Sequence, residues 1–145
     1  MSRTHETEIV IHAPVAAVWA QLIDFAEHAQ WSDSFVLHGV PSPGARGRVG
    51  FRIFGLQMSH PIRLETVEPL RRLAWRGGPR GLISGRHYFE LRSHGSDGAQ
   101  TRLVHGEAFE GFAVPVLWPL LMKALGPSYD RFNQQLRDRV ESACS

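Results

Sequence analysis

Two strand-like runs joined by a glycine-rich turn, between residues 82 and 110, constrain the fold more than any other part of this chain. In residues 85–92 and 101–110, apolar and polar side chains alternate with a period of two, which is typical of strands with one buried face. The turn at 94–98 is rich in Gly, Asp and Ser, which tolerate the backbone angles of a reversal. The inner face of this predicted β-hairpin carries His87, Phe89, Leu91, Thr101, Leu103, His105, Glu107 and Phe109.

Three ionisable residues, His87, His105 and Glu107, thus fall on a face that should be apolar. Burying such groups costs free energy unless they are paired, hydrated or used. If the hairpin is symmetric about Ser96, His87 lies directly opposite His105, with Glu107 on the diagonal. A register shifted by two residues would keep all three on the same face but change the pairs. The pattern predicts a cavity with polar groups in its wall rather than a dry core.

The rest of the chain predicts one antiparallel sheet covered by a C-terminal helix. Further predicted strands cover residues 7–12, 34–38, 48–54, 57–67 and 72–76, and two short helices cover 13–24 and 25–30. In the C-terminal helix, one apolar stripe consists of Leu125, Tyr129, Phe132, Leu136 and Val140. A sheet that curls around this helix without closing on it leaves a cavity between the two.

The segment 112–125 is apolar on nearly all sides, and Gly126 and Pro127 are expected to kink or split the helix after it. Three interpretations remain open for this segment: a lid over the cavity, a surface for a dimer or a membrane, or a simple cap on the sheet. It is too short, and too interrupted by Pro115 and Pro119, to span a bilayer, so no stable membrane insertion is expected.

Composition favours one ordinary globular domain over residues 1–145, with 43% hydrophobic residues and a net charge of +2. Nucleic-acid binding is not expected, because there is no Lys/Arg block and no zinc-finger spacing. The only cysteine, Cys144, permits no internal disulfide, and the N-terminus shows no apolar signal segment. A cytoplasmic protein is expected, and the preference for arginine over lysine is typical of GC-rich bacteria.

Several segments resemble, in their order, the START-like superfamily with its helix-grip fold, and within it the bacterial SRPBCC proteins of the polyketide cyclase/dehydrase and lipid transport group. The segments that carry the resemblance are Ile11–Trp19, Asp24–Phe25 with Trp31, Val67–Pro69, Leu73–Trp75, Gly85–Leu91, Thr101–Glu107 with Phe109–Gly111, and Phe132–Asn133 with Leu136. The resemblance implies an α+β fold, in which a curved antiparallel sheet of about seven strands wraps around a long C-terminal helix. It also implies two short helices after the first strand and a ligand cavity between sheet and helix.

The first functional hypothesis is binding of a hydrophobic small molecule, of lipid, sterol or polyketide type, in that cavity. His87, His105 and Glu107 would orient its polar end. The residues expected to contact the ligand are Phe51, Ile53, His60, Ile62, Leu64, Trp75, His87, Phe89, Leu103, His105, Glu107, Phe109, Tyr129, Phe132 and Leu136. No cofactor is expected, and the chain is expected to be a monomer or a weak homodimer.

Other interpretations of the trio stay open. It could act as acid and base in an aromatase/cyclase or dehydratase, which makes His87, His105 and Glu107 the candidate catalytic residues. It could equally be a mutually satisfied structural cluster. A zinc site that adds His60 is conceivable, but the relatives do not use a metal as a rule, so none is expected. A further alternative is a protein-interaction module with a filled core.

Overall fold

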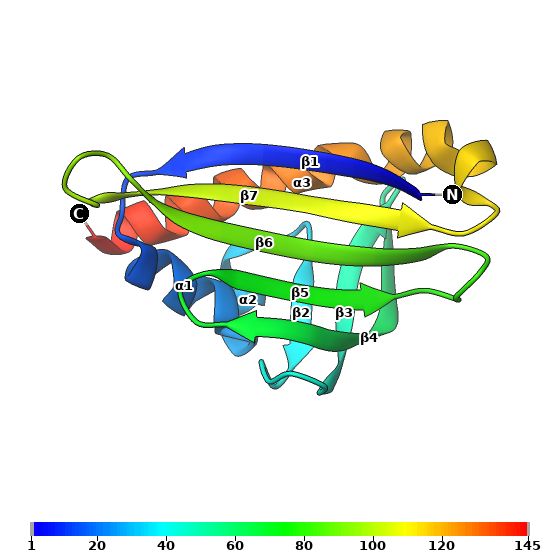
Figure 1. Ribbon diagram of the computed structural model, residues 1–145, viewed down its shortest axis with the longest axis horizontal. Coiled ribbons are helices and arrows are strands. Elements are labelled where there is room, and N and C mark those ends of the chain that lie inside the picture. Colours follow the sequence, from blue (N-terminus) through cyan, green and yellow to red (C-terminus); the bar gives the residue numbers. More distant parts are fainter. Residues whose placement is uncertain (1, 145) are drawn as a thin grey trace.

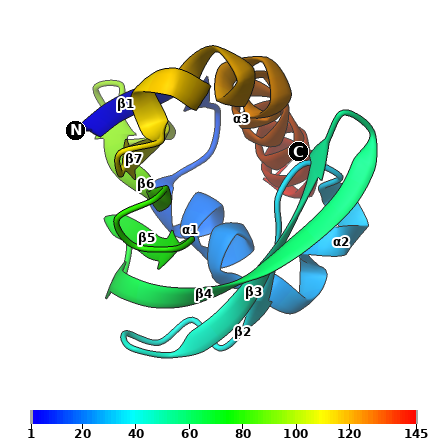
Figure 2. The same cartoon turned by 90° about the vertical axis from the view of Figure 1, so that its right-hand side faces the viewer.

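In the computed structural model, which describes residues 2–144, seven strands form one antiparallel sheet in the order β1-β7-β6-β5-β4-β3-β2. The strands are β1 (Ser2–Ile11), β2 (Val36–Gly39), β3 (Arg46–Ile53), β4 (Leu56–Glu68), β5 (Arg72–Gly77), β6 (Ser84–His94) and β7 (Gln100–Glu110). The pair β1–β7 joins strands that are distant in sequence, whereas every other neighbouring pair in this sheet is a hairpin of consecutive strands. The sheet is strongly curved, and its concave face encloses the core (Figure 2).

Three short helical elements follow β1, and one long helix ends the chain. These are α1 (Val15–Ile23), the 3₁₀ turn η1 (Phe25–Glu27), α2 (His28–Trp31) and α3 (Val114–Cys144). The helix α3 runs along the concave face and contacts β1, β7 and β3, so it bridges the two sides of the curved sheet (Figures 1 and 2). This is the helix-grip architecture, which confirms the expected fold class.

The helix α3 differs from the sequence expectation at its prolines. It is one helix that includes Pro119 and Pro127, so Gly126 and Pro127 do not split it. The predicted apolar segment therefore forms the first three turns of the same helix. The first strand also begins earlier than predicted, at Ser2, because β1 pairs with β7 along its whole length. Its inward positions include polar residues such as His5 and Thr7, which weakened the alternation in the sequence.

The register of the β6–β7 hairpin is shifted by two residues from the symmetric arrangement expected. His87 faces Glu107, and Phe89 faces His105. The cause lies in the turn: β6 extends to His94, which pairs with Gln100, so the turn is centred on Asp97 rather than on Ser96. The expected face is nevertheless correct, because a shift of two preserves the alternation of side chains.

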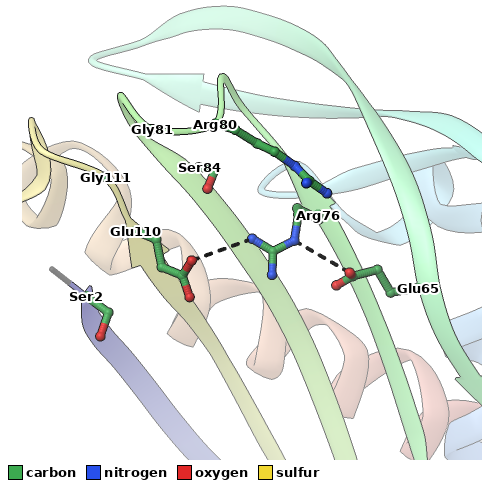
Figure 3. Close-up of a pocket in the computed structure, with 8 residues that line it drawn as sticks. All are labelled: Ser2, Glu65, Arg76, Arg80, Gly81, Ser84, Glu110 and Gly111. Carbon is green, nitrogen blue, oxygen red and sulfur yellow. Dashed lines mark hydrogen bonds and ion pairs between the residues drawn. The ribbon is translucent and has the colours of Figure 1, made fainter.

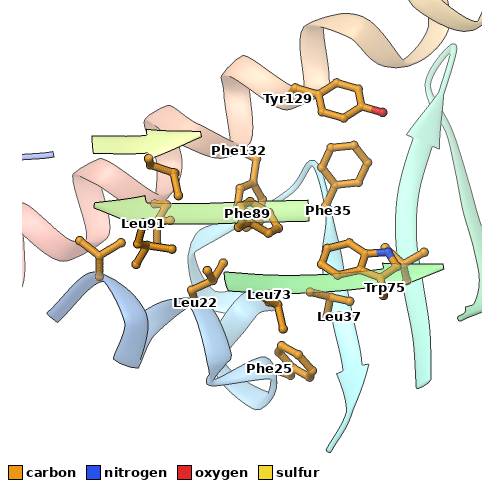
Figure 4. Close-up of a cluster of buried hydrophobic side chains, with 14 of the residues drawn as sticks. Leu22, Phe25, Phe35, Leu37, Leu73, Trp75, Phe89, Leu91, Tyr129 and Phe132 are labelled. Carbon is orange, nitrogen blue, oxygen red and sulfur yellow. The ribbon is translucent and has the colours of Figure 1, made fainter. Parts of the chain in front are cut away.

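One half of the space between sheet and helix is densely packed, and we call it the closed half. There α1 and α2 pack against the C-terminal part of α3. Its fully buried side chains include Leu22, Leu37, Leu73, Phe89 and Phe132, which Figure 4 labels, together with Leu103 and Leu136. His28 lies in this half, and its hydrogen bonds are those of a neutral imidazole. Nε2 donates to the Leu22 carbonyl, and Nδ1 accepts from the Leu37 N–H.

Candidate functional site

The other half of the same space, which we call the open half, contains a cavity of about 830 Å³. Its walls come from β3–β7 on one side and from Leu121 and Leu125 of α3 on the other. Exposed arginines, among them Arg46, Arg63 and Arg80, also line it, so the cavity reaches the surface. Ligand sites in proteins are typically about 300–1,000 Å³ and mostly apolar. The open half thus has the size and wall chemistry of a ligand site.

Two paired glycines form part of the cavity floor. Gly77 of β5 lies opposite Gly85 of β6, and both occupy inward positions of their strands. A Cβ added to Gly85 would overlap the carboxylate of Glu107, and a Cβ added to Gly77 would overlap the ring of His60. The two glycines therefore leave room for the side chains of His60 and Glu107, which fold over them.

A continuous chain of polar contacts leads from the cavity into the core. The Tyr129 hydroxyl donates to Glu107 Oε1, which also lies 3.2 Å from Nδ1 of His87. Nε2 of His87 lies 2.5 Å from Nε2 of His105. On the far side of its ring, Nδ1 of His105 lies 2.8 Å from Oδ1 of Asn133. The two ring nitrogens of each histidine are thus both engaged.

The series of polar contacts ends at Thr7 of the edge strand β1. The amide of Asn133 donates to the Thr7 hydroxyl over 2.8 Å, and that hydroxyl donates to the backbone carbonyl of His105 over 2.9 Å. His87, His105 and Asn133 are all nearly inaccessible to solvent. Because each buried polar group has a partner, the cluster avoids the desolvation cost of unpaired groups.

Within this series of polar contacts, His105 and Glu107 have pKa values that are both lowered, with opposite consequences for their charge. Burial, reinforced by the neighbouring charge of His87, holds the pKa of His105 well below its usual value, although the hydrogen bond to Asn133 opposes the shift. Burial alone would raise the pKa of Glu107, but the charge of His87 and the hydrogen bonds from His87 and Tyr129 outweigh it and lower that pKa. His105 is therefore neutral and Glu107 ionised near neutral pH.

Aromatic rings surround the polar chain on the cavity side. Trp75 stacks on His87 with ring centroids 4.4 Å apart, and Tyr129 lies nearly parallel to the same imidazole at 5.4 Å. Phe35 of the loop before β2 contacts His87 edge-on at 4.8 Å. These three rings enclose the imidazole of His87 on the cavity side.

The predicted ligand contacts divide between the two halves. Those that line the cavity are Phe51, Ile53, His60, Ile62, Trp75, His87, Glu107 and Phe109. Those placed in the packed core behind it instead are Leu64, Phe89, Leu103, His105, Tyr129, Phe132 and Leu136. Of the second group, His105 and Tyr129 still reach the cavity wall through their contacts with His87 and Glu107. The sequence pattern identified the inward face but not the point where packing gives way to the cavity.

Several residues of the site were missed in the sequence. Asn133 is inward-facing on α3, four residues from Tyr129, and that spacing was available as a signal. Gly77 and Gly85 occupy inward positions in strands whose side chains alternate between the two faces of the sheet. A missing side chain at such a position indicates open space. Phe35 carried no such signal, because its position over His87 depends on how the loop before β2 folds back.

Two elements of the cavity wall, α3 and the β3–β4 hairpin, also carry exposed apolar residues. On the first turns of α3, Val116 and Leu120 are exposed while Leu121 lines the cavity. Phe54 and Leu56 are exposed at the tip of the β3–β4 hairpin. The segment 112–125 therefore covers the cavity with one side and shows apolar side chains to solvent with the other.

A second, more polar pocket of about 650 Å³ lies near the same end of the sheet (Figure 3). At its centre Arg76 lies between two acidic side chains, 3.5 Å from Glu65 and 4.0 Å from Glu110. The guanidinium is thus already neutralised by carboxylates of the protein. This pocket shows no excess charge that would recruit an ionic ligand.

Within residues 2–144, no group of three or more His, Cys, Asp or Glu side chains has the geometry to hold a metal ion. None of the helices described is long and apolar enough to cross a membrane.

Comparison with known proteins agrees with this architecture. Residues 2–141 match the family model described as polyketide cyclase/dehydrase and lipid transport. The ZhuI aromatase/cyclase from Streptomyces sp. R1128 superposes with a TM-score of 0.80 at 15% identity, over 100% of this chain and 97% of that chain. A START superfamily protein from Mycobacterium smegmatis superposes with a TM-score of 0.77 at 15% identity, over 97% of this chain and 98% of the other.

A protein from Thermus thermophilus superposes with a TM-score of 0.74 at 20% identity, over 99% of this chain and 100% of that one. At such identities the superpositions establish the fold alone. No curated protein matches the chain. The match of the family model over nearly the whole chain carries the assignment: this chain belongs to the polyketide cyclase/dehydrase and lipid transport family and has the START-like helix-grip fold.

Proposed function

We propose that this protein binds a hydrophobic small molecule in the cavity of the open half, with Glu107 and His87 holding its polar end. The observation that carries the proposal is a surface-connected cavity of about 830 Å³ with mostly apolar walls and the contacting side chains of His87 and Glu107 in its floor. A few convergent polar groups in an apolar cavity are the usual arrangement of small-molecule sites. The filled core required by a pure protein-interaction module is not what the open half presents.

The apolar walls define the body of the ligand. Phe51, Trp75 and Phe109 contribute aromatic surface, and Ile53, Ile62 and Leu125 contribute aliphatic surface. A ligand that fills this space buries mostly apolar area, which supplies most of the binding free energy at roughly 25 cal/mol per Å². The proposal keeps the expectations of a cytoplasmic location and a monomeric or weakly dimeric state.

Acid–base catalysis is the second candidate, and one specific observation favours it. Nδ1 of His87 and Oε1 of Glu107 lie 3.2 Å apart at the wall of the cavity, where a bound substrate would touch them. The aromatase/cyclase from Streptomyces has the same fold. If this chain catalyses a cyclisation or dehydration, the pair would supply the base and the acid.

The first test is to purify the protein from its own host and record native mass spectra for a co-purified molecule. We expect an additional mass that is lost on denaturation. Glu107→Gln then separates the two candidates in assays with the identified molecule. A binding protein keeps its ligand within about tenfold of the original affinity, whereas an acid–base catalyst loses roughly 10²–10⁴-fold in rate. A protein that binds no apolar molecule under any of these conditions would contradict the proposal.

A further inference from the structure

The Thr7 hydroxyl, at the end of the series of polar contacts, determines which atom donates in each of its hydrogen bonds. The Thr7 hydroxyl has a single proton, which it donates to the His105 carbonyl, an acceptor only. From Asn133 the hydroxyl therefore accepts, so the NH₂ group of that amide faces Thr7 and its oxygen faces His105. Because an amide oxygen only accepts, Nδ1 of His105 carries a proton.

This direction is transmitted to the cavity. A neutral His105 with its proton on Nδ1 has a bare Nε2, so Nε2 of His87 must donate across the 2.5 Å contact. The remaining proton of the pair lies between Nδ1 of His87 and Oε1 of Glu107. Tyr129 donates to the same Oε1. Whichever of the two atoms holds the shared proton, the other carboxylate oxygen, Oε2, is left bare.

Within this series of hydrogen bonds, Oε2 of Glu107 is the atom that a ligand can reach. Oε2 of Glu107 lies over Gly85 in the cavity floor, whereas the contacts from Tyr129 and His87 both go to Oε1. His60, folded over the neighbouring Gly77, donates Nδ1 to the Pro61 carbonyl, so this N–H is not free for a ligand. Above these two glycines the cavity therefore presents the carboxylate oxygen of Glu107 as a hydrogen-bond acceptor.

We propose that the cavity selects ligands by a hydroxyl group: the molecule it binds presents a phenolic or alcoholic O–H to Oε2 of Glu107, and an apolar molecule with only a carbonyl or ether there is disfavoured. This inference rests on the proposed ligand-binding function and names the chemical class of its ligand. Thr7 and Asn133 act as positioning residues, because they fix the proton arrangement without touching the ligand.

Three pyrene probes of the same ring system test the selectivity: 1-hydroxypyrene, 1-methoxypyrene and 1-acetylpyrene. Their dissociation constants are measured through quenching of tryptophan fluorescence, since Trp75 lines the cavity. A hydrogen bond to a charged acceptor contributes enough for 1-hydroxypyrene to bind roughly tenfold or more tightly than either other probe. Equal affinities for all three would overturn the inference and leave the ligand-binding function standing.

Substitutions of Glu107 should reduce the preference for 1-hydroxypyrene to different extents. In Glu107→Gln the amide NH₂ takes the place of Oε1 beside Nδ1 of His87, so a carbonyl oxygen still faces the cavity, and the preference for 1-hydroxypyrene falls to a few-fold. In Glu107→Leu no acceptor remains and the preference disappears. The matched control Phe109→Leu changes an apolar wall and weakens all three probes alike. A preference unchanged in Glu107→Leu would contradict the inference, whereas no binding of any probe by the unmodified protein would contradict the ligand-binding function as well.

Discussion

The closed and open halves share one sheet and one helix but differ in what fills the space between them. In the closed half, α1 and α2 supply a further layer of side chains, and Phe89, Leu103 and Phe132 are fully buried. In the open half these helices are absent, and Gly77 and Gly85 replace two inward side chains. In this protein the cavity therefore arises locally, where inward side chains are missing from part of an otherwise packed sheet.

The largest expected difference between the halves is in stability. Phe132→Ala leaves a void in the closed half and should lower the free energy of unfolding by about 3–5 kcal/mol. Phe51→Ala, which removes a partly exposed cavity wall, should cost less than half of that. Urea unfolding of both variants measures the two values. Equal losses would mean that the open half is packed as tightly as the closed half.

The pH dependence of stability should follow the neutral histidines of the packed region. Burial lowers the pKa of His28 from 6.5 to about 4. An unfolded histidine takes up its proton near pH 6.5 while the folded one does not, so the free energy of unfolding falls as the pH drops from 6.5 towards 4. For His28 alone the loss approaches about 3 kcal/mol at the lower limit.

Urea unfolding at several pH values between 7.5 and 4.5 tests this slope. His28→Leu removes one of the two buried neutral histidines and should make the slope over this range shallower, leaving the contribution of His105, whose pKa burial also lowers. A variant that keeps the full slope would show that other groups cause the pH dependence.

The smallest expected effect concerns the two glycines of the open half. Gly85→Ala places a methyl group where the Glu107 carboxylate lies, and should weaken 1-hydroxypyrene about tenfold, or about 1.4 kcal/mol. Gly77→Ala is a matched control, because it removes similar cavity space but displaces His60 instead. Equal effects of the two substitutions on all three pyrene probes would indicate that lost volume, and not the carboxylate, governs affinity.

Much of the architecture was predictable because side-chain alternation has a strict period. The faces of β6 and β7 followed from it, and so did the polar trio on the inner face. The pairing of His87 with Glu107 was not predictable, because the five residues of the turn admit more than one centre and a shift of two leaves the pattern unchanged. The partners Asn133 and Thr7 come from elements far apart in the sequence, so only the assembled fold could reveal them.

Local periodicity was therefore enough to predict the sheet, the long helix and the ionisable groups on the buried face. The boundary between the core and the cavity came only with the assembled fold, because it depends on which sheet positions the short helices cover. The assembled fold also decided the order of the polar chain from Thr7 to Glu107, since a hydrogen bond requires two atoms to meet, and the meeting is set by register and packing.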